Sequence, residues 1–421
     1  MNIKSIFYNK DKALVNGLFF SLFSFVNRGF SFLLVILLAN YLSTAEYGYL
    51  SLFTTVIMIV SYFMALSTEG YLSVSYFKIG IEGIKQTVSG ILMISFVSLT
   101  VMLLNLLLFK SYLIQLFKLS QLVLVLIVFI CFFTLYSNLF LDYFRLKGKV
   151  YNYGILSCSN AFLNLIASII LVKYIHLGWM GRVYAQFGCF FLFGLAGILY
   201  FYAKGYFTKP NCKFLRKMTV WGLPIIPHLA TGFLRQGCDR YIINFYHTID
   251  DVGVFSFALN LANIVVMVGI GFNQSNSVDI YKILGNCNMT IEDKRSYLTK
   301  QKKKILGVYV IMTVLIMLFV PLIVPIFVPK YSNSIIYFLI LAIWGFAQCL
   351  YFLYTNYLFF YNKTKSIMYV TFGTSVLHLL LSLILTRYSL IYTCLVYVLT
   401  QFVIFCLIKS KADKILKLNL N

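Results

Sequence analysis

Residues 305–328 read ILGVYVIMTVLIMLFVPLIVPIFV, an apolar run that follows Lys302, Lys303 and Lys304 and precedes Lys330. A helix needs about 20 apolar residues to cross a hydrocarbon core of roughly 30 Å, so this run predicts one membrane-spanning helix. Similar runs recur along the whole chain. We predict about twelve spans, at residues 13–41, 47–67, 87–109, 119–141, 153–173, 181–203, 218–246, 252–279, 305–328, 334–360, 366–386 and 389–408. The predicted fold is an all-α polytopic membrane protein.

Composition supports this prediction. The 421 residues are 61% hydrophobic and only 11% charged, with a mean hydropathy of +0.87, which excludes a soluble enzyme. The first span is too long for the apolar core of a signal peptide and lacks a small-residue cleavage site, so we expect it to stay as a helix. The nine cysteines form no CxxC pair and the four histidines no HExxH-like site, so we expect neither a metal nor a cofactor.

Lysine and arginine predict the orientation. With the N-terminus inside, only six of them fall on the outer side: Lys110, Lys118, Lys173, Arg182, Lys330 and Arg387. The cytoplasmic turns and both termini hold most of the others, as the positive-inside rule requires. The net charge of +23 is then explained by a solvated cytoplasmic rim beside the membrane lipids, with no need for a nucleic-acid partner.

The sequence repeats at an offset of 205 residues. The matched pairs are Gly17 with Gly222, Tyr41 with Tyr246, Glu46 with Asp251, Gly48 with Gly253 and Ser51 with Ser256. An insertion in the loop 280–304 raises the offset between matched residues of the two halves to 216 in the part of the chain that follows this loop. Two six-helix bundles follow, related by a pseudo-two-fold axis along the membrane normal and enclosing a central cleft.

The repeat also predicts the domain boundaries. We expect an N-terminal bundle at residues 1–203 and a cytoplasmic linker at 204–217. A C-terminal bundle at 218–408 and a basic cytoplasmic tail at 409–421 complete the chain.

Four short stretches carry a family resemblance: Leu42–Gly48, Gly222–Pro227, Asp239–Ile243 and Val252–Ala258. With the helix count and the repeat, they resemble the polysaccharide transporter branch of the multidrug/oligosaccharidyl-lipid/polysaccharide exporters, and within it the Wzx-type O-antigen flippases. The resemblance implies a bacterial inner-membrane protein that moves undecaprenyl-pyrophosphate-linked O-antigen or capsule repeat units to the periplasmic leaflet by alternating access. It implies no enzymatic step, and as partners the lipid-linked oligosaccharide, membrane lipids, and the polymerase and chain-length regulator of the same pathway.

Charges inside the spans are the candidate site residues: Arg28 in the first span, and Arg235, Asp239 and Arg240 in the seventh. A charge near the centre of a bilayer costs about 2.5–3.5 kcal/mol on insertion scales, so such side chains normally face protein or a water-filled cavity. We predict that the three arginines bind the substrate and that Asp239 couples transport to an ion.

Other readings of these charges stay open. Arg235 and Asp239 are four residues apart and could pair with each other, while Arg240 could extend to the headgroups. Arg28 shares its helix span with no acidic residue and continues a stripe of Gly17, Ser21, Ser24 and Ser31.

Polar stripes also run along the fifth span (Ser157, Asn160, Asn164, Ser168) and the eighth (Ser256, Asn260, Asn263). Hydrogen bonds between helices are their simplest explanation.

Three other functions are compatible with so many spans. A multidrug or cation antiporter of the same superfamily would favour buried carboxylates over arginines. A major-facilitator transporter would carry a basic Gly-x-x-x-Asp-Arg motif within residues 69–86, which this chain lacks. A membrane polysaccharide polymerase or ligase would need a large external loop, and all the predicted external turns are short.

Overall fold

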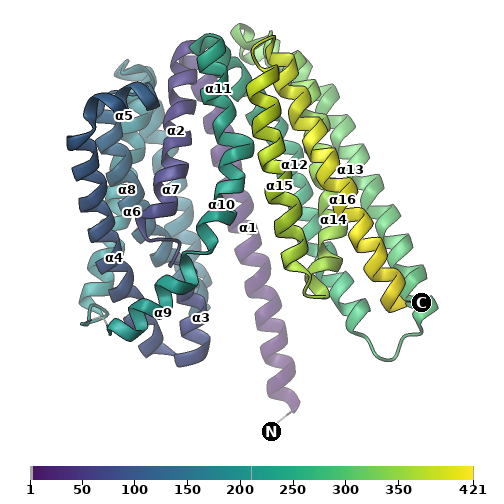
Figure 1. The fold of residues 1–421 in the computed structure, drawn as a ribbon. Helices are drawn as coiled ribbons and strands as arrows, with labels where there is room; N and C mark the ends of the chain where they lie inside the picture. Colours follow the sequence, from purple (N-terminus) through teal and green to yellow (C-terminus); the bar gives the residue numbers. More distant parts are fainter. Residues whose placement is uncertain (1–2, 210, 421) are drawn as a thin grey trace. The chain divides into compact units, whose positions relative to one another are not determined.

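A computed structural model describes residues 3–209 and 211–420, and every regular element in those ranges is a helix (Figure 1). Ten helices are long and apolar enough to span a membrane. They are α2 (Thr44–Met64), α4 (Ile81–Leu108), α6 (Gln121–Leu146), α7 (Val150–Ile169) with its π-helical extension η1 (Ile170–Tyr174), α8 (Gly178–Ala203), α12 (Ile249–Gly285), α13 (Ile291–Phe327), α14 (Ser334–Phe360), α15 (Thr364–Leu385) and α16 (Leu390–Leu420). The first predicted span lies in α1 (Ile3–Tyr41), and Phe25–Tyr41 is an apolar segment within its described residues.

The seventh predicted span, 218–246, is broken rather than continuous. It consists of α9 (Cys212–Gly222), α10 (Ile225–Gly232), the π-helix η2 (Phe233–Gly237) and α11 (Cys238–Tyr246). Pro224 lies between α9 and α10, and Pro227 lies in the first turn of α10. Proline lacks the backbone N–H that a continuous helix uses, so the helix is interrupted between Gly222 and Ile225.

Short helices occupy several predicted connections: α3 (Tyr71–Ile79), α5 (Lys110–Phe117) and the 3₁₀ turn η3 (Pro329–Tyr331). The loop 280–304 was predicted to hold an insertion. Instead α12 extends to Gly285 and α13 begins at Ile291, so most of the added length is helical.

Helix α9 begins inside the predicted linker 204–217 and packs on the N-terminal bundle. The side-chain ends of Met218 and Leu215 pack closely against Gly90 of α4. Trp221 packs on Tyr71, with ring centroids 5.6 Å apart. The chain accordingly divides into two compact units, Met1–Ala230 and Thr231–Asn421, with the division inside the seventh span.

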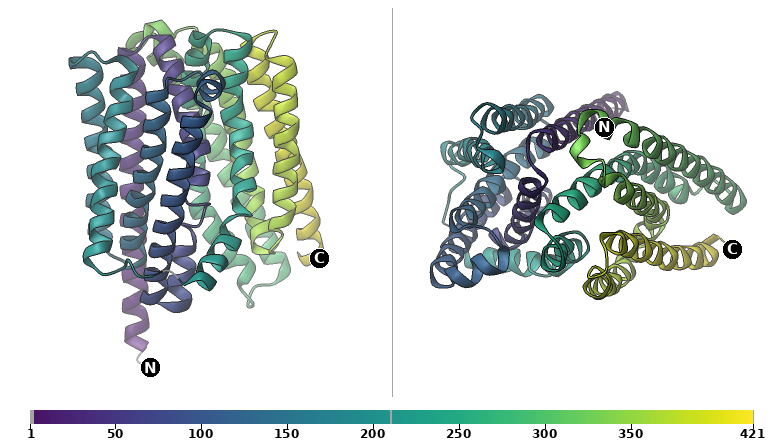
Figure 2. Two further views of the ribbon diagram at one scale, coloured as in Figure 1. Left: turned by 60° about the vertical axis from the view of Figure 1, so that its left-hand side comes forward. Right: turned by 90° about the horizontal axis from the view of Figure 1, so that it is seen from above.

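The long helices of each unit run side by side (Figure 2), and equivalent pairs of helices pack together in both units. In the N-terminal unit, α6 packs on α2 and α8, and α7 packs on α1. In the C-terminal unit, α14 packs on α12 and α16, and α15 packs on η2 and α11. These are equivalent helices of the predicted repeat, so each half buries its apolar residues in the same way.

Capping residues explain one of the repeated pairs. Ser43 caps α2, where the Glu46 N–H donates to Ser43 Oγ (3.2 Å) and the Ser43 N–H donates to Glu46 Oε2 (2.9 Å). Thr248 and Asp251 form the same reciprocal pair at the start of α12: the Asp251 N–H donates to Thr248 Oγ1 (3.2 Å) and the Thr248 N–H donates to Asp251 Oδ2 (3.1 Å). Each pair satisfies two backbone donors that the first helical turn leaves without partners.

Burial separates the central helices from the peripheral ones. In the most apolar window of α6, 61% of residues are buried, compared with 11% in α13 and 17% in α4. A helix that is apolar yet exposed on most of its surface is suited to contact lipid tails. Several polar side chains are nevertheless fully buried inside the C-terminal unit, among them Asp239 and His378.

Candidate functional site

The centre of the C-terminal unit contains a buried pair formed by Asp239 and His378. Asp239 lies on α11, next to η2, and His378 lies on α15. Asp239 Oδ2 and His378 Nε2 are 2.8 Å apart, and the two side chains are 0% and 1% exposed. The partner of Asp239 is thus a histidine 139 residues away, and not Arg235, four residues away on its own span.

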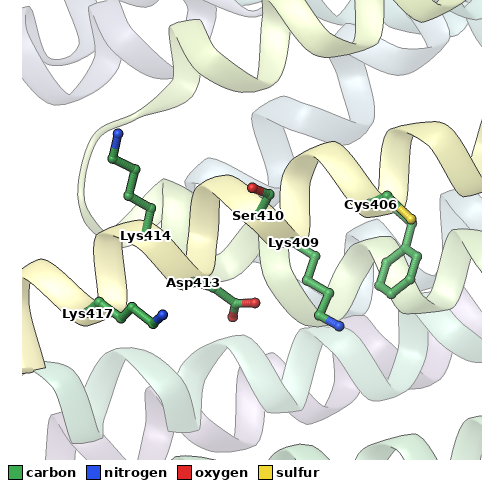
Figure 3. Close-up of a pocket in the computed structure, with 7 residues that line it drawn as sticks. Cys406, Lys409, Ser410, Asp413, Lys414 and Lys417 are labelled. Atoms are coloured by element: carbon green, nitrogen blue, oxygen red, sulfur yellow. The ribbon is translucent and has the colours of Figure 1, made fainter.

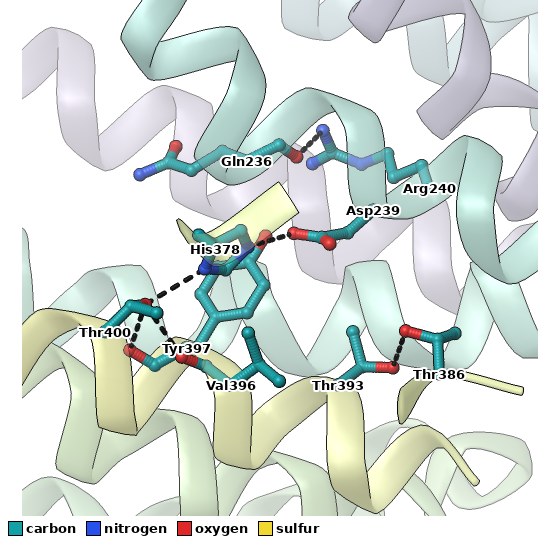
Figure 4. Close-up of polar contacts among 9 residues, drawn as sticks. All are labelled: Gln236, Asp239, Arg240, His378, Thr386, Thr393, Val396, Tyr397 and Thr400. Atoms are coloured by element: carbon teal, nitrogen blue, oxygen red, sulfur yellow. Dashed lines mark hydrogen bonds and ion pairs between the residues drawn. The ribbon is translucent and has the colours of Figure 1, made fainter. Parts of the chain in front are cut away.

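Helix α16 completes the surroundings of the histidine (Figure 4). His378 Nδ1 lies 3.0 Å from Thr400 Oγ1, and the Thr400 hydroxyl donates to the Val396 carbonyl at 2.7 Å. Tyr397 places its ring edge-on to the imidazole, with centroids 4.9 Å apart. The imidazole is therefore fixed at both nitrogens and cannot rotate without breaking one of these contacts.

Arg235 projects from η2 toward the same part of α16. Its Nη1 donates to Gln401 Oε1 at 3.4 Å, a long hydrogen bond to a neutral acceptor. Arg235, His378 and Thr400 line one small cavity, together with Gln236, Trp344, Gln348, Tyr397 and Gln401. The cavity measures about 10 Å³, close to the space that one water molecule needs.

Arg235 Nε and Gln401 Nε2, two polar atoms of residues that line this cavity, have no hydrogen-bond partner among the described residues. Buried polar atoms are normally hydrogen-bonded. Both atoms therefore lack the partner that a buried polar atom normally has.

Arg240 lies one residue beyond Asp239 and contacts α12 instead. Its Nε donates to Ser256 Oγ at 3.3 Å, and its Nη1 donates to the Gln236 carbonyl at 3.0 Å. Ser256 is the first residue of the predicted polar stripe on the eighth span. The structure therefore brings Arg235, Asp239 and Arg240 into one unit, each with different partners.

Arg28 is half-buried on α1 and has no hydrogen bond or ion pair within the described part of the chain. The predicted face that it shares with Gly17, Ser21 and Ser24 lies outside the part of the chain whose side chains the structure describes. Ser31 donates to the Asn27 carbonyl at 3.0 Å within α1. Arg28 therefore differs from Arg235, which at least has an amide partner.

The polar stripe of the fifth span connects α7 with three neighbouring helices. Asn27 of α1 donates to Ser157, and Asn160 donates to Ser137 of α6 at 3.4 Å. Further along, the guanidinium of Arg182 on α8 donates to Asn164 and, at 3.0 Å, to Ser168. The interpretation of this stripe as interhelical hydrogen bonding is therefore correct, and the hydrogen bonds include Arg182, a cation that the charge distribution assigned to the outer side.

A second concave surface lies along the C-terminal part of α16 (Figure 3). It is lined by Phe405, Cys406, Lys409, Ser410, Asp413, Lys414 and Lys417. Its lysines lie in the predicted basic tail, which is helical. None of the predicted site residues lines this groove, so the buried cluster remains the better candidate.

The family follows from the sequence comparison. Residues 13–277, more than half of the chain, match the family described as polysaccharide biosynthesis protein. The chain belongs to this family. No curated protein matches this family member.

Solved structures establish the fold of this polysaccharide biosynthesis protein. It is similar to an inward-facing multidrug resistance MATE family transporter of the MOP superfamily, with a TM-score of 0.72 and 14% identity over 92% of this chain and 94% of that one. An outward-facing multidrug resistance MATE family transporter of the MOP superfamily matches with a TM-score of 0.63 and 13% identity, over 94% of this chain and 93% of that one. A MATE protein in complex with MaD3S matches with a TM-score of 0.62 and 14% identity, also over 94% of this chain and 93% of that one. This family member is therefore a multi-pass membrane protein with a transporter fold.

Proposed function

We propose that the protein is a flippase that moves an undecaprenyl-pyrophosphate-linked oligosaccharide from the cytoplasmic to the periplasmic leaflet of the bacterial inner membrane by alternating access. Membership of the polysaccharide biosynthesis family supports a polysaccharide precursor as substrate, and the transporter fold supports translocation. Translocation breaks no covalent bond of the substrate, so the protein needs no catalytic residue. The substrate would be an O-antigen or capsule repeat unit, which a polymerase and a chain-length regulator then extend.

The observation that carries this proposal is the cationic character of two spans. Arg28 has no counter-ion among the described residues, and Arg235 has only the Gln401 amide. A guanidinium remains charged and fits two phosphate oxygens in a bidentate fork. The pyrophosphate group would supply the missing negative charge, with Arg240 as a third contact, while Asp239 would provide the ion-coupling step.

A multidrug or cation antiporter is the alternative, because the similar structures include multidrug resistance transporters. Their identity of 13–14% supports the fold alone. A cationic drug would be repelled by Arg28 and Arg235, whereas a pyrophosphate would be attracted. An export assay with both substrate classes separates the two functions.

Arg28→Ala tests the flippase directly. We expect the variant to insert at the wild-type level, by immunoblot of membranes, and to abolish surface polysaccharide, by gel electrophoresis. Arg28→Lys should restore part of the polysaccharide, because an ammonium keeps the charge and loses the fork. Lys85→Ala, which removes a partly exposed cation beside Glu82, is the control and should export normally. Normal polysaccharide from abundant Arg28→Ala protein would refute the proposal.

The orientation is a separate part of the proposal. The lysine distribution favours both termini in the cytoplasm and the turns near Thr44, Asp250 and Lys330 outside. A cysteine introduced at residue 300 should therefore react with a membrane-impermeant maleimide only after the cells are lysed. Labelling at residue 300 in intact cells would contradict this orientation.

A further inference from the structure

We propose that Asp239 and His378 form a proton-binding site that is loaded in this structure, and that its proton controls whether Arg235 is available to an anion. The inference rests on the proposed function for the identity of that anion, but the proton site itself does not. His378 is then a functional residue, and α16 connects it to Arg235.

The Thr400 hydroxyl fixes the tautomer of His378. A hydroxyl has one proton to donate, and a backbone carbonyl can only accept. At 2.7 Å from the Val396 carbonyl, the Thr400 proton lies in that hydrogen bond. Thr400 Oγ1 is then the acceptor in its 3.0 Å contact with His378, so Nδ1 of His378 carries a proton.

The contact with Asp239 requires a second proton. If Nδ1 alone were protonated, the lone pair of Nε2 would face a carboxylate oxygen at 2.8 Å, which is repulsive. One more proton must lie between Nε2 and Oδ2, on either atom. The pair as a unit therefore holds two protons and has a net charge of zero.

Loss of that proton requires a specific rearrangement. The remaining proton must move from Nδ1 to Nε2, where it can be donated to the carboxylate. The Thr400 hydroxyl must then turn away from the Val396 carbonyl and donate to Nδ1. The unloaded pair carries one negative charge in a site with no exposure to solvent.

Arg235 is positioned to respond to that charge. The ionisable groups near the pair are Arg235 on η2, Cys238 and Arg240 on α11, and Cys394 and Tyr397 on α16. Arg240 is engaged by Ser256 and the Gln236 carbonyl, whereas Arg235 lines the same cavity as His378. Its amide partner Gln401 directly follows Thr400 in the chain.

The charge of the pair therefore sets the affinity of Arg235 for other anions. An unloaded pair attracts the guanidinium more strongly than the neutral Gln401 does, because hydrogen bonds between ions are the stronger ones. A loaded pair leaves Arg235 without a counter-ion and available to phosphate. Proton binding and anion binding then strengthen each other by the same factor.

The first measurement addresses the proton site in the full-length protein. The chain has only four histidines, at positions 176, 228, 247 and 378, so ¹⁵N-histidine labelling with His378→Asn as reference assigns the signal of His378. At acidic pH we expect Nδ1 to be protonated, and as the pH rises its proton should move to Nε2. Thr400→Val should alter this transition, while Thr393→Val should not, because Thr393 is equally buried on α16 but bonds to Thr386. An Nε2–H tautomer at every pH would overturn the proton site.

The second measurement addresses the link to Arg235, with inorganic pyrophosphate as the probe. In Asp239→Asn the partner of His378 is permanently uncharged, so this variant is the reference. Pyrophosphate itself titrates in the same way with both proteins, and the ratio of the wild-type Kd to the variant Kd therefore removes that contribution. We expect a ratio near one at acidic pH that rises about tenfold at alkaline pH, within the usual range of coupling. A ratio that does not change with pH would overturn the link. If neither protein binds pyrophosphate, the anion half of the inference falls with the proposed function, while the histidine measurement still decides the proton site.

Discussion

The buried pair should be strongly coupled in stability, and a double-mutant cycle of His378→Leu and Asp239→Leu measures this coupling. At the observed 2.8 Å and an effective dielectric constant of about 20, full charges would attract by about 6 kcal/mol. Removing one member leaves a buried polar group without its partner, which typically costs 3–5 kcal/mol. Each single substitution should therefore destabilise the protein by about that amount.

The double variant distinguishes an interaction between Asp239 and His378 from a general loss of stability. Replacing both members of a buried pair with apolar side chains is often neutral or stabilising, so it should lie close to the wild type. The assay is denaturant unfolding in detergent, followed by tryptophan fluorescence, since Trp344 lines the cavity. The pair Arg145–Asp142 is the control, because its N–O distance is also 2.8 Å but its side chains are 54% and 31% exposed. Its coupling should stay below about 1 kcal/mol. If the two single substitutions lower the free energy of unfolding by amounts that add up to the loss in the double variant, Asp239 and His378 are not coupled and the reasoning is refuted.

Three further predictions concern folding. Ser43→Ala and Thr248→Ala should each cost about 1 kcal/mol in thermal unfolding, because they remove equivalent helix caps, and no loss in either would contradict the capping assignment. Gly222→Ala should cost about 1–3 kcal/mol since a methyl group would meet the neighbouring backbone, whereas Gly188→Ala, with open space around it, should not destabilise. Burial raises the pKa of Glu69, so its carboxylate opposes folding once the pH exceeds its ordinary value near 4.5. Glu69→Gln should therefore raise the melting temperature at about pH 8 and leave it unchanged at about pH 4; an equal shift at both would exclude this origin.

Much of the fold was predictable because a bilayer imposes one requirement on every span. About 20 apolar residues must follow one another, and this signal located the ten long helices to within a few residues at most ends. The short helices α3, α5 and α9 were not predicted. They are too short to give a hydropathy signal, and tertiary packing such as that of Trp221 on Tyr71 stabilises them.

The candidate site was only half predictable. The scarcity of charge inside spans identified Arg235, Asp239 and Arg240, but the partner of Asp239 was missed. Spacing rules connect residues three or four apart on a helix, whereas His378 is 139 residues away and isolated in an apolar span. The i, i+4 rule also assumes α-helical geometry, and the π-helix η2, which contains Arg235, widens the turn just before Asp239.

The polar stripe of α7 and the charged residues of the seventh span differ in what they require of their surroundings. Ser157 and Asn160 are neutral, and a single hydrogen bond from Asn27 or to Ser137 satisfies them. A buried carboxylate needs a proton or a cation to compensate its charge. An apolar pair would fill the same space without that requirement and often with equal or greater stability. Asp239 and its histidine therefore add no stability that an apolar pair would not supply, which is typical of residues that serve a function.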